Sequence, residues 1–272
     1  NGGAMYLTGT NSVIVIHNST FADNASTDNT KNIGGDGVVV LTDSNLTVTN
    51  STFDRSQTTN GSGATLYNSV KGSSRISFQD CQFRDAFAGY SGIIYTVVVS
   101  PVPTYIAFDN CVFSGNNIID NSACVYVEGN RTSLNVTNCV FNNNTADVIS
   151  AIRYIGSDGY AGLFNTNITN GWQRLKAAVE LDLTYGDGGI VEVVGCLFQN
   201  QTGQQRPENG STVGMTGVLQ MAALSIASDT NKYKSITIQN CSFYDNVGIA
   251  LGASRIYVQG DNYTVNMTNN HY

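Results

Sequence analysis

The residue types that perform acid, base or metal chemistry are few in this sequence, and they are scattered. The two histidines, His17 and His271, each lie beside an asparagine in equivalent copies of a repeat, where a structural role is expected. No Cys-x-x-Cys or histidine-rich spacing indicates zinc. Glu180 and Asp182 alternate along one extended segment, so we expect them to share its outer face as a solvated patch. The densest acidic stretch comprises Glu180, Asp182, Asp187 and Glu192. The sequence therefore predicts no catalytic residue, no metal ligand and no cofactor.

The N-glycosylation sequon, Asn-x-Ser/Thr, is the strongest chemical signal. It occurs 14 times, whereas random placement of the 32 asparagines and the 51 serines and threonines would give about 6. The excess predicts a eukaryotic secretory route and an extracellular, secreted or cell-surface chain that carries covalent N-glycans. The alternative is that an Asn-rich and Thr-rich repeat creates sequons as a by-product. The sequon asparagines are Asn18, Asn24, Asn45, Asn50, Asn60, Asn130, Asn135, Asn143, Asn167, Asn200, Asn209, Asn240, Asn262 and Asn266.

Five of the six cysteines recur two positions before a phenylalanine, and Cys124 stands apart. Cysteine is a good small core residue, so packing is their main expected role. An extracellular location also permits disulfides, and Cys81 with Cys111 and Cys196 with Cys241 are the pairs expected to lie within bridging distance. Bridged and free forms both remain open. The recurring cysteines are Cys81, Cys111, Cys139, Cys196 and Cys241.

Tyrosines recur beside apolar residues that are expected to point inward, so the tyrosines themselves should point outward. Such a row could contact sugar rings or a neighbouring molecule by stacking. The alternative is that a strand simply favours tyrosine on its solvated face. The tyrosines of this row are Tyr6, Tyr67, Tyr95, Tyr126 and Tyr154.

A repeat running through the whole chain must position all of these side chains. It reads apolar, x, apolar, x, Asn or Asp, Cys or Ser, x, Phe, and successive copies of the aromatic position are 23 to 45 residues apart. A period near 30 with such variation is typical of β-coils whose loops differ in length. The aromatic position is occupied by Phe21, Phe53, Phe83, Phe113, Phe141, Phe198 and Phe243, with a degenerate copy at Phe164 and a last one at Tyr272.

Each copy alternates apolar and polar residues and is rich in Val, Ile, Thr and Phe, which predicts short strands joined by bends. A solenoid explains why the same residue types recur at the same point of every copy, and a sandwich does not. We therefore predict an all-β fold, a right-handed parallel β-helix of about nine coils, with residues 1–272 as a single domain. Asn18, Asn50, Asn110, Asn138 and Asn240 are expected at left-handed bends, where their amides should form a ladder between coils.

The position of each sequon in this repeat predicts how readily it is modified. Asn135 and Asn266 each lie between two inward residues, so both should face solvent and carry glycans. For Asn18, Asn50 and Asn240, a glycan would compete with the amide ladder, so we expect less modification there.

The repeat resembles that of polymorphic outer-membrane proteins. The resemblance rests on Phe-x-x-Asn motifs, FADN at 21, FSGN at 113, FNNN at 141 and FYDN at 243, and on the Gly-Gly-Ala-apolar segment at 2–5, which degrades to GSGATL at 61 and SGII at 91. It implies a β-helical passenger domain that works in adhesion and self-association, within the wider pectate-lyase-like superfamily. That superfamily includes polysaccharide lyases and hydrolases, so an enzyme is one alternative; the acidic stretch with Arg153 or Arg174 as the base would then be its site.

The composition excludes two classes of partner. A net charge of -7 with no basic cluster disfavours nucleic acid, and the longest apolar runs, such as 93–99, are too short to span a membrane. Both ends of the sequence fall within a coil, so we expect the chain to be a segment of a longer solenoid or of one that associates with itself end to end. We therefore expect a non-enzymatic extracellular structural glycoprotein, a subunit or repeat of a filament, stalk or surface coat. A surface adhesin or glycan-binding β-helix is the first alternative, and the polysaccharide lyase or hydrolase is the second.

Overall fold

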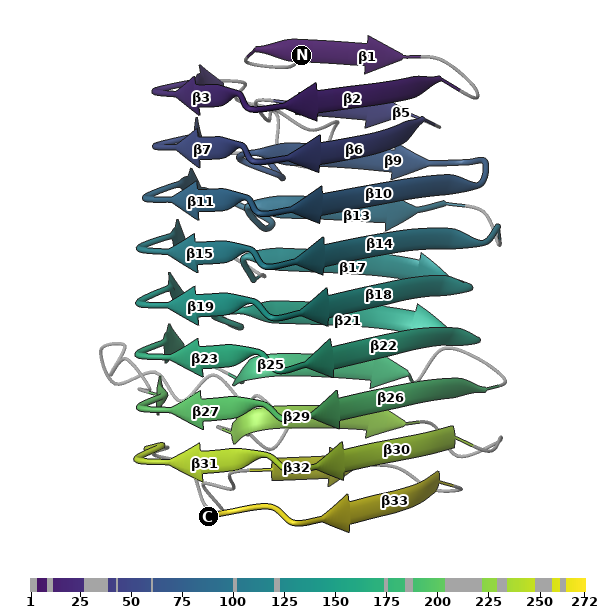
Figure 1. Cartoon of the computed structure of the whole chain (residues 1–272), viewed down its shortest axis with the longest axis vertical. Coiled ribbons are helices and arrows are strands. Elements are labelled where there is room, and N and C mark those ends of the chain that lie inside the picture. Colours follow the sequence, from purple (N-terminus) through teal and green to yellow (C-terminus); the bar gives the residue numbers. More distant parts are fainter. Residues whose placement is uncertain are drawn as a thin grey trace, which may run out of the picture.

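The structure is a computed structural model in which every regular element of the described residues is a β-strand, and the strands stack into a solenoid (Figure 1). Four parallel sheets, here named A to D in chain order, form its sides. The described residues are 4–8, 12–26, 39–42, 44–59, 61–99, 102–119, 123–173, 176–183, 188–203, 222–228, 234–247, 256–259 and 263–272.

Sheets A and B are the long sides of the solenoid. Sheet A consists of β1 (Met5–Thr8), β5 (Val39–Thr42), β9 (Leu66–Val70), β13 (Ile94–Val98), β17 (Val125–Asn130), β21 (Ile152–Ser157), β25 (Ala177–Leu183), β29 (Ala222–Ser228) and β32 (Ile256–Gln259). Sheet B consists of β2 (Val13–His17), β6 (Asn45–Thr49), β10 (Ser74–Gln79), β14 (Thr104–Asp109), β18 (Thr132–Thr137), β22 (Gly159–Phe164), β26 (Gly189–Val194), β30 (Lys234–Gln239) and β33 (Tyr263–Thr268).

Sheets C and D are the short sides. Sheet C consists of β3 (Thr20–Ala22), β7 (Thr52–Asp54), β11 (Gln82–Arg84), β15 (Val112–Ser114), β19 (Val140–Asn142), β23 (Asn167–Thr169), β27 (Leu197–Gln199) and β31 (Ser242–Tyr244). Sheet D consists of β4 (Ala25–Ser26), β8 (Gln57–Thr58), β12 (Phe87–Ala88), β16 (Asn117–Ile118), β20 (Thr145–Ala146), β24 (Trp172–Gln173) and β28 (Thr202–Gly203).

The predicted parallel β-helix is confirmed. The chain visits sheets A, B, C and D in turn and then begins the next coil beside the first. As it descends in Figure 1, it runs leftward along the near sheet and rightward along the far one, which makes the coil right-handed. Among the described residues, the two long sheets have nine strands and the short ones have eight and seven, so complete four-sided coils are fewer there than the nine expected.

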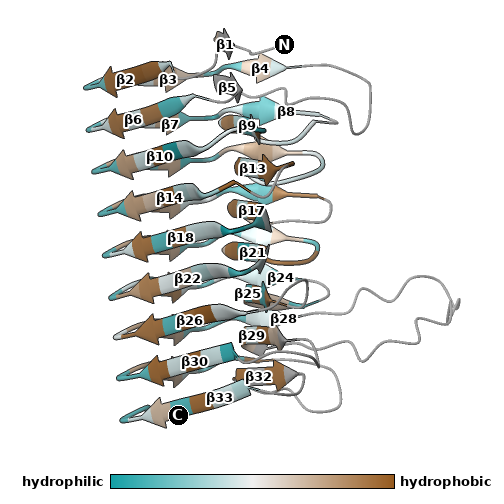
Figure 2. Cartoon of the chain, turned by 90° about the vertical axis from the view of Figure 1, so that its right-hand side faces the viewer, coloured by the Kyte–Doolittle hydropathy of each residue, from teal (hydrophilic) through white to brown (hydrophobic). Residues whose placement is uncertain are grey.

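Alternating burial packs the interior, and hydrophobic segments recur in strand after strand down the stack (Figure 2). The phenylalanines of sheet C lie directly over one another: the ring centroids of Phe83 and Phe113 are 4.5 Å apart, and those of Phe113 and Phe141 are 4.6 Å apart. The next member of this column is Ile168, in register with Phe141. The prediction of a degenerate copy at Phe164 was therefore wrong, because Phe164 ends β22 in sheet B.

The bends on either side of sheet C explain the recurrent asparagines. All five bend asparagines predicted from the repeat have a positive φ, from 49° at Asn50 to 54° at Asn138. Asparagine tolerates this left-handed conformation better than most residues, so the sequence specifies the corner directly. The predicted ladder is present in part: the Asn110 amide donates to Asp80 (2.6 Å), and the Asn138 amide donates to Asp109 (3.2 Å).

A second amide ladder lies inside the solenoid, at the asparagine of the Phe-x-x-Asn motif. The buried Asn116 side chain donates to the Phe83 carbonyl (3.1 Å) and to the Asn144 side-chain oxygen (2.9 Å). Asn144 in turn donates to the Phe113 carbonyl (3.0 Å). The motif thus satisfies backbone groups at a corner where the sheet hydrogen bonds are interrupted, since buried polar groups need partners.

Candidate functional sites

The sequon asparagines lie on the surface. The structure describes eleven of the fourteen, and none of these eleven is buried. Asn60, Asn209 and Asn262 lie outside the described residues. Asn68, Asn116 and Asn144, which are not in sequons, are the buried asparagines of the described part. Exposed sequon asparagines are Asn18, Asn50, Asn130, Asn143, Asn167, Asn200, Asn240 and Asn266, and half-buried ones are Asn24, Asn45 and Asn135.

Three sequons have an amide that is already engaged. The side-chain nitrogen of Asn24 donates to the Ala22 carbonyl (3.2 Å), that of Asn135 to the Tyr105 hydroxyl (3.2 Å), and that of Asn200 to Asn170 (2.7 Å). A glycan is attached through this same nitrogen, so folding competes with modification at these three positions. Solvent exposure at Asn135 agrees with its predicted orientation only in part, because the residue is half-buried.

The bend sequons differ from their expected state. Asn18, Asn50 and Asn240 are exposed, and their side-chain amides bond to no other residue of the described part. The amide ladder at this bend is formed instead by Asn110 and Asn138, which are not in sequons. Lower glycosylation was predicted at the three bend sequons because a glycan would compete with the amide ladder. The structure does not show that ladder at these three positions.

The tyrosine row exists on the outer face of sheet A, but it is shorter than predicted. Tyr67, Tyr95 and Tyr126 are in register on neighbouring strands, with ring centroids 5.7 Å and 5.1 Å apart. Tyr67 and Tyr95 are half-buried, and Tyr126 is buried. Tyr6 lies in β1, and its side chain is outside the described residues. In the described part, the partly exposed members of the row are therefore Tyr67 and Tyr95.

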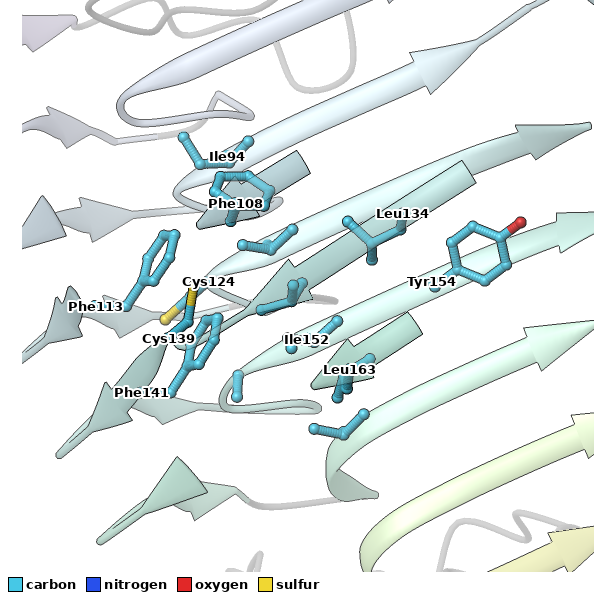
Figure 3. Close-up of a cluster of buried hydrophobic side chains, with 14 of the residues drawn as sticks. Ile94, Phe108, Phe113, Cys124, Leu134, Cys139, Phe141, Ile152, Tyr154 and Leu163 are labelled. Atoms are coloured by element: carbon cyan, nitrogen blue, oxygen red, sulfur yellow. The ribbon is translucent and has the colours of Figure 1, made fainter. Parts of the chain in front are cut away.

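Tyr154 was wrongly assigned to this row. It is in register with Val127, whose side chain points inward, and it is completely buried. Its hydroxyl donates to the Thr132 carbonyl at 2.7 Å, across the corner between sheets A and B. Figure 3 shows its ring at the opposite end of the lumen from Phe113 and Phe141. The outward position that the prediction gave to Tyr154 belongs to Arg153, because side chains alternate and a shift of one residue reverses the face.

Arg153 joins the tyrosine row to the acidic stretch. Its guanidinium lies 5.1 Å from the centroid of the Tyr126 ring and donates to the Glu180 carboxylate at 2.8 Å. Lys176 also donates to Glu180. The side chains of Arg153 and Glu180 are only 13% and 6% exposed, so this ion pair is well shielded from water. Glu180 is therefore neutralised by two cations and is not part of a solvated patch.

The three described acids of that stretch belong to two different sheets. Glu180 and Asp182 are in β25 of sheet A, whereas Glu192 is in β26 of sheet B and accepts a bond from the Tyr160 hydroxyl at 2.5 Å. Asp187 and Arg174 lie outside the described residues. Among described residues, no group of three or more His, Cys, Asp or Glu could hold a metal ion. His17 bonds to Thr49 (2.7 Å), and His271 pairs with β31 beyond the bend, so the two are not at equivalent points.

All six cysteines are buried free thiols, so neither expected disulfide is formed in the structure. Cys81, Cys111 and Cys139 follow one another in a column at the bend between sheets B and C, and Cys196 and Cys241 continue it after Thr166. Each of the five thiols donates to a backbone carbonyl, for example Cys81 to Gln79 at 3.2 Å. A hydrogen bond to the Cys139 side chain, together with burial, raises the pKa of Cys111 to about 12.

One part of the lumen contains buried polar atoms without partners. In the described part, Ser56, Thr65, Asn68 and Thr96 contribute five of the six such atoms, and Gln201 contributes the other. An unpaired buried polar atom costs about 1–3 kcal/mol. Five would cost as much as the whole stability of an ordinary domain, about 5–15 kcal/mol. A dry lumen at this level is therefore strongly disfavoured.

Comparison with known proteins leaves the family open. No family model matches the chain, and no curated protein matches it. No helix in the described part is long and apolar enough to cross a membrane. The functional assignment therefore depends on the sites described above.

Proposed function

We propose that this chain is a non-enzymatic structural glycoprotein of the extracellular space, whose solenoid forms a subunit or repeat of a filament, stalk or surface coat. The observation that carries the proposal is the placement of the sequons. All eleven described sequon asparagines reach the surface, while the three buried asparagines of the described part are outside sequons. A lattice of glycans around a stack of hydrogen-bonded coils would protect an extended rod from proteases and from lateral aggregation.

The side-chain rows supply the mechanical part of the proposal. Parallel backbone pairing joins successive coils, and aromatic stacking and the internal amide ladder add to it in part of the stack. Because the backbone pairing recurs in successive coils, tension or bending would be distributed along the rod. End-to-end association is part of the proposal, and the parallel backbone pairing that joins successive coils is the kind of contact that would join two copies.

The environment of Arg153 argues against the lyase alternative. A general base needs an unprotonated group that can reach its substrate. Arg153 is held between the Tyr126 ring and the Glu180 carboxylate, and it is shielded from solvent. Incubation with acidic polysaccharides and calcium should give no unsaturated product. Appearance of such a product, and its loss in Arg153→Lys, would replace the structural proposal by an enzymatic one.

A relation to polymorphic outer-membrane-protein repeats and to the pectate-lyase-like superfamily also remains a proposal. It is supported by the role of the Phe-x-x-Asn motif, whose phenylalanine stacks between coils and whose asparagine closes the adjoining corner.

Among the described residues, the glycan-binding alternative concerns Tyr67 and Tyr95. They are the described members of the outward row that retain partial exposure. A carbohydrate array should detect binding that is lost in Tyr67→Ala/Tyr95→Ala and retained in Tyr154→Phe, because Tyr154 faces the lumen. Equal binding by all three proteins would remove this alternative.

The proposed glycoprotein is tested by secreting the chain from eukaryotic cells and mapping its glycopeptides by mass spectrometry. We expect occupancy at most described sequons, with the lowest occupancy at Asn24, Asn135 and Asn200, whose amides are engaged. An unmodified secreted chain would overturn the proposal. Electron microscopy of the same material tests assembly, because isolated rods of uniform length would contradict end-to-end association.

A further inference from the structure

We propose that the lumen between β9 and β13 binds an ordered water molecule, held by Asn68 and Thr96. Both residues are completely buried. They are register partners on neighbouring parallel strands, and the alternating burial of both strands turns their side chains inward. Parallel strands are about 4.8 Å apart, so the two side chains begin at a spacing that one water molecule can bridge.

The chemistry of the pair fits water. The Asn68 amide offers two donor hydrogens and an acceptor oxygen, and the Thr96 hydroxyl both donates and accepts. None of the three polar atoms has a protein partner. A buried water typically makes about three hydrogen bonds, which these atoms supply. A metal cation is a poor fit, because calcium needs about six to eight oxygen ligands and the pair brings no charge.

The rest of the row shows why these two positions differ. The same inward row continues through Val127, Tyr154 and Leu181, which are apolar except for the Tyr154 hydroxyl. That hydroxyl crosses to the Thr132 carbonyl and is satisfied there. Asn68 and Thr96 are shorter than tyrosine and reach no protein group. Water therefore serves as the hydrogen-bond partner of Asn68 and Thr96, as the Thr132 carbonyl does for Tyr154.

The proposal is tested by a high-resolution crystal structure of the chain and of Asn68→Leu/Thr96→Val. We expect one well-ordered solvent peak about 2.7–3.2 Å from Asn68 and Thr96 in the unmodified chain, and no peak in the double variant. A lumen without solvent density, or an Asn68 amide bonded directly to protein, would overturn the proposal.

Water relaxation dispersion measured in solution is the second test, and it needs no crystals. The double variant should contain one long-lived internal water fewer than the unmodified chain. The matched control is Thr132→Val: Thr132 is also a buried threonine, but its hydroxyl bonds to the Gly129 carbonyl at 3.1 Å. The control should keep the full count. An unchanged count in the double variant would contradict the proposal.

Discussion

The lumen is built differently at two levels of the same solenoid. Around Asn116, Asn144 and Tyr154, buried polar side chains bond to protein groups of an adjacent coil or an adjoining strand. Nearer the first coils, Asn68 and Thr96 also point inward, but they have no protein partner. The backbone is alike at both levels, since the strands pair in one continuous register.

Position within the coil explains this difference. Asn116 and Asn144 lie at a corner, where the backbone carbonyls of the preceding coil point into the lumen and can accept their amides. Asn68 and Thr96 lie in the middle of sheet A, where backbone groups are already paired between strands. A buried polar side chain is therefore satisfied by protein where it reaches a free carbonyl, as Asn116, Asn144 and Tyr154 do, whereas Asn68 and Thr96 reach none.

The cysteine column runs through both levels of the lumen. The rate at which its thiols are chemically labelled therefore reports whether bulk solvent reaches either level. Because the pKa of Cys111 is raised to about 12, its thiolate fraction at pH 8 should be about a thousandfold below that of an ordinary thiol. We expect iodoacetamide to label no thiol of the native chain and all six after denaturation, as mass spectrometry would show. Faster labelling of Cys81 than of Cys139 would mean that bulk water enters the first coils. Fewer than six labelled thiols after denaturation without reductant would reveal the disulfides predicted from sequence.

The Cys111 thiol gives stability a defined pH dependence. In the unfolded chain it loses its proton near pH 8.5, but in the folded chain it keeps that proton up to about pH 12. Above pH 8.5 the folded state therefore binds more protons than the unfolded state, and stability falls as the pH rises. Urea unfolding midpoints should decline from pH 8 to pH 11. Replacement of Cys111 by Ser should reduce the slope, and an unchanged slope would show that the thiols do not cause it.

Gly159→Ala should disrupt the level of the lumen at which Tyr154 is bonded to protein. A Cβ at Gly159 would lie 2.0 Å from the Tyr154 hydroxyl and 2.4 Å from the Thr132 carbonyl, so the bond between those groups cannot persist. We expect a loss of more than about 3 kcal/mol in urea unfolding. Gly189→Ala is the matched control, because Gly189 is the register partner of Gly159 and its Cβ would meet the flexible Leu183 side chain at 3.1 Å. Equal losses in the two variants would contradict this account.

Asn144→Leu compares the two levels directly with Asn68→Leu. Loss of the Asn144 amide leaves the Phe113 carbonyl and the Asn116 backbone amide without partners, which should cost about 3 kcal/mol. Asn68→Leu leaves no protein group without a hydrogen-bond partner, and it makes this position of the inward row apolar. The free energy of unfolding should therefore change by less than about 1 kcal/mol. Thermal unfolding of both variants measures the difference. A larger loss for Asn68→Leu would show that its amide bonds to protein after all.

The fold was predictable because its determinants are local and recur in every coil. Alternation fixed the inward rows, and the bend asparagines revealed the corners through their tolerance of left-handed backbone. Phe164 was misplaced because an aromatic residue was weighted above spacing, whereas the structure retains the spacing and accepts Ile168. Tyr154 was misplaced for a related reason, since a shift of one residue changes which face a side chain occupies.

The candidate sites were less predictable, because they depend on contacts between coils. Spacing along the sequence gave no sign that Arg153 would contact both Tyr126 and Glu180, since these three residues come from successive strands of one sheet. The internal amide ladder could have been found from the Phe-x-x-Asn motif, whose asparagine recurs at Asn116 and Asn144. The unpartnered Asn68 and Thr96 needed the register of β9 and β13, which only the folded chain supplies.

Thr96→Val should produce the smallest effect and yields the most sensitive comparison. A hydroxyl bonded only to water loses little when it is replaced by a methyl group, so we expect a change below about 0.5 kcal/mol in urea unfolding. Thr132→Val removes a hydroxyl that donates to the Gly129 carbonyl at 3.1 Å, and it should cost about 1 kcal/mol. The two threonines are both buried, so the hydrophobic gain of the new methyl group is similar and cancels between them. A cost for Thr96→Val equal to that of Thr132→Val would place Thr96 in a protein hydrogen bond and would remove the distinction between the two levels of the lumen.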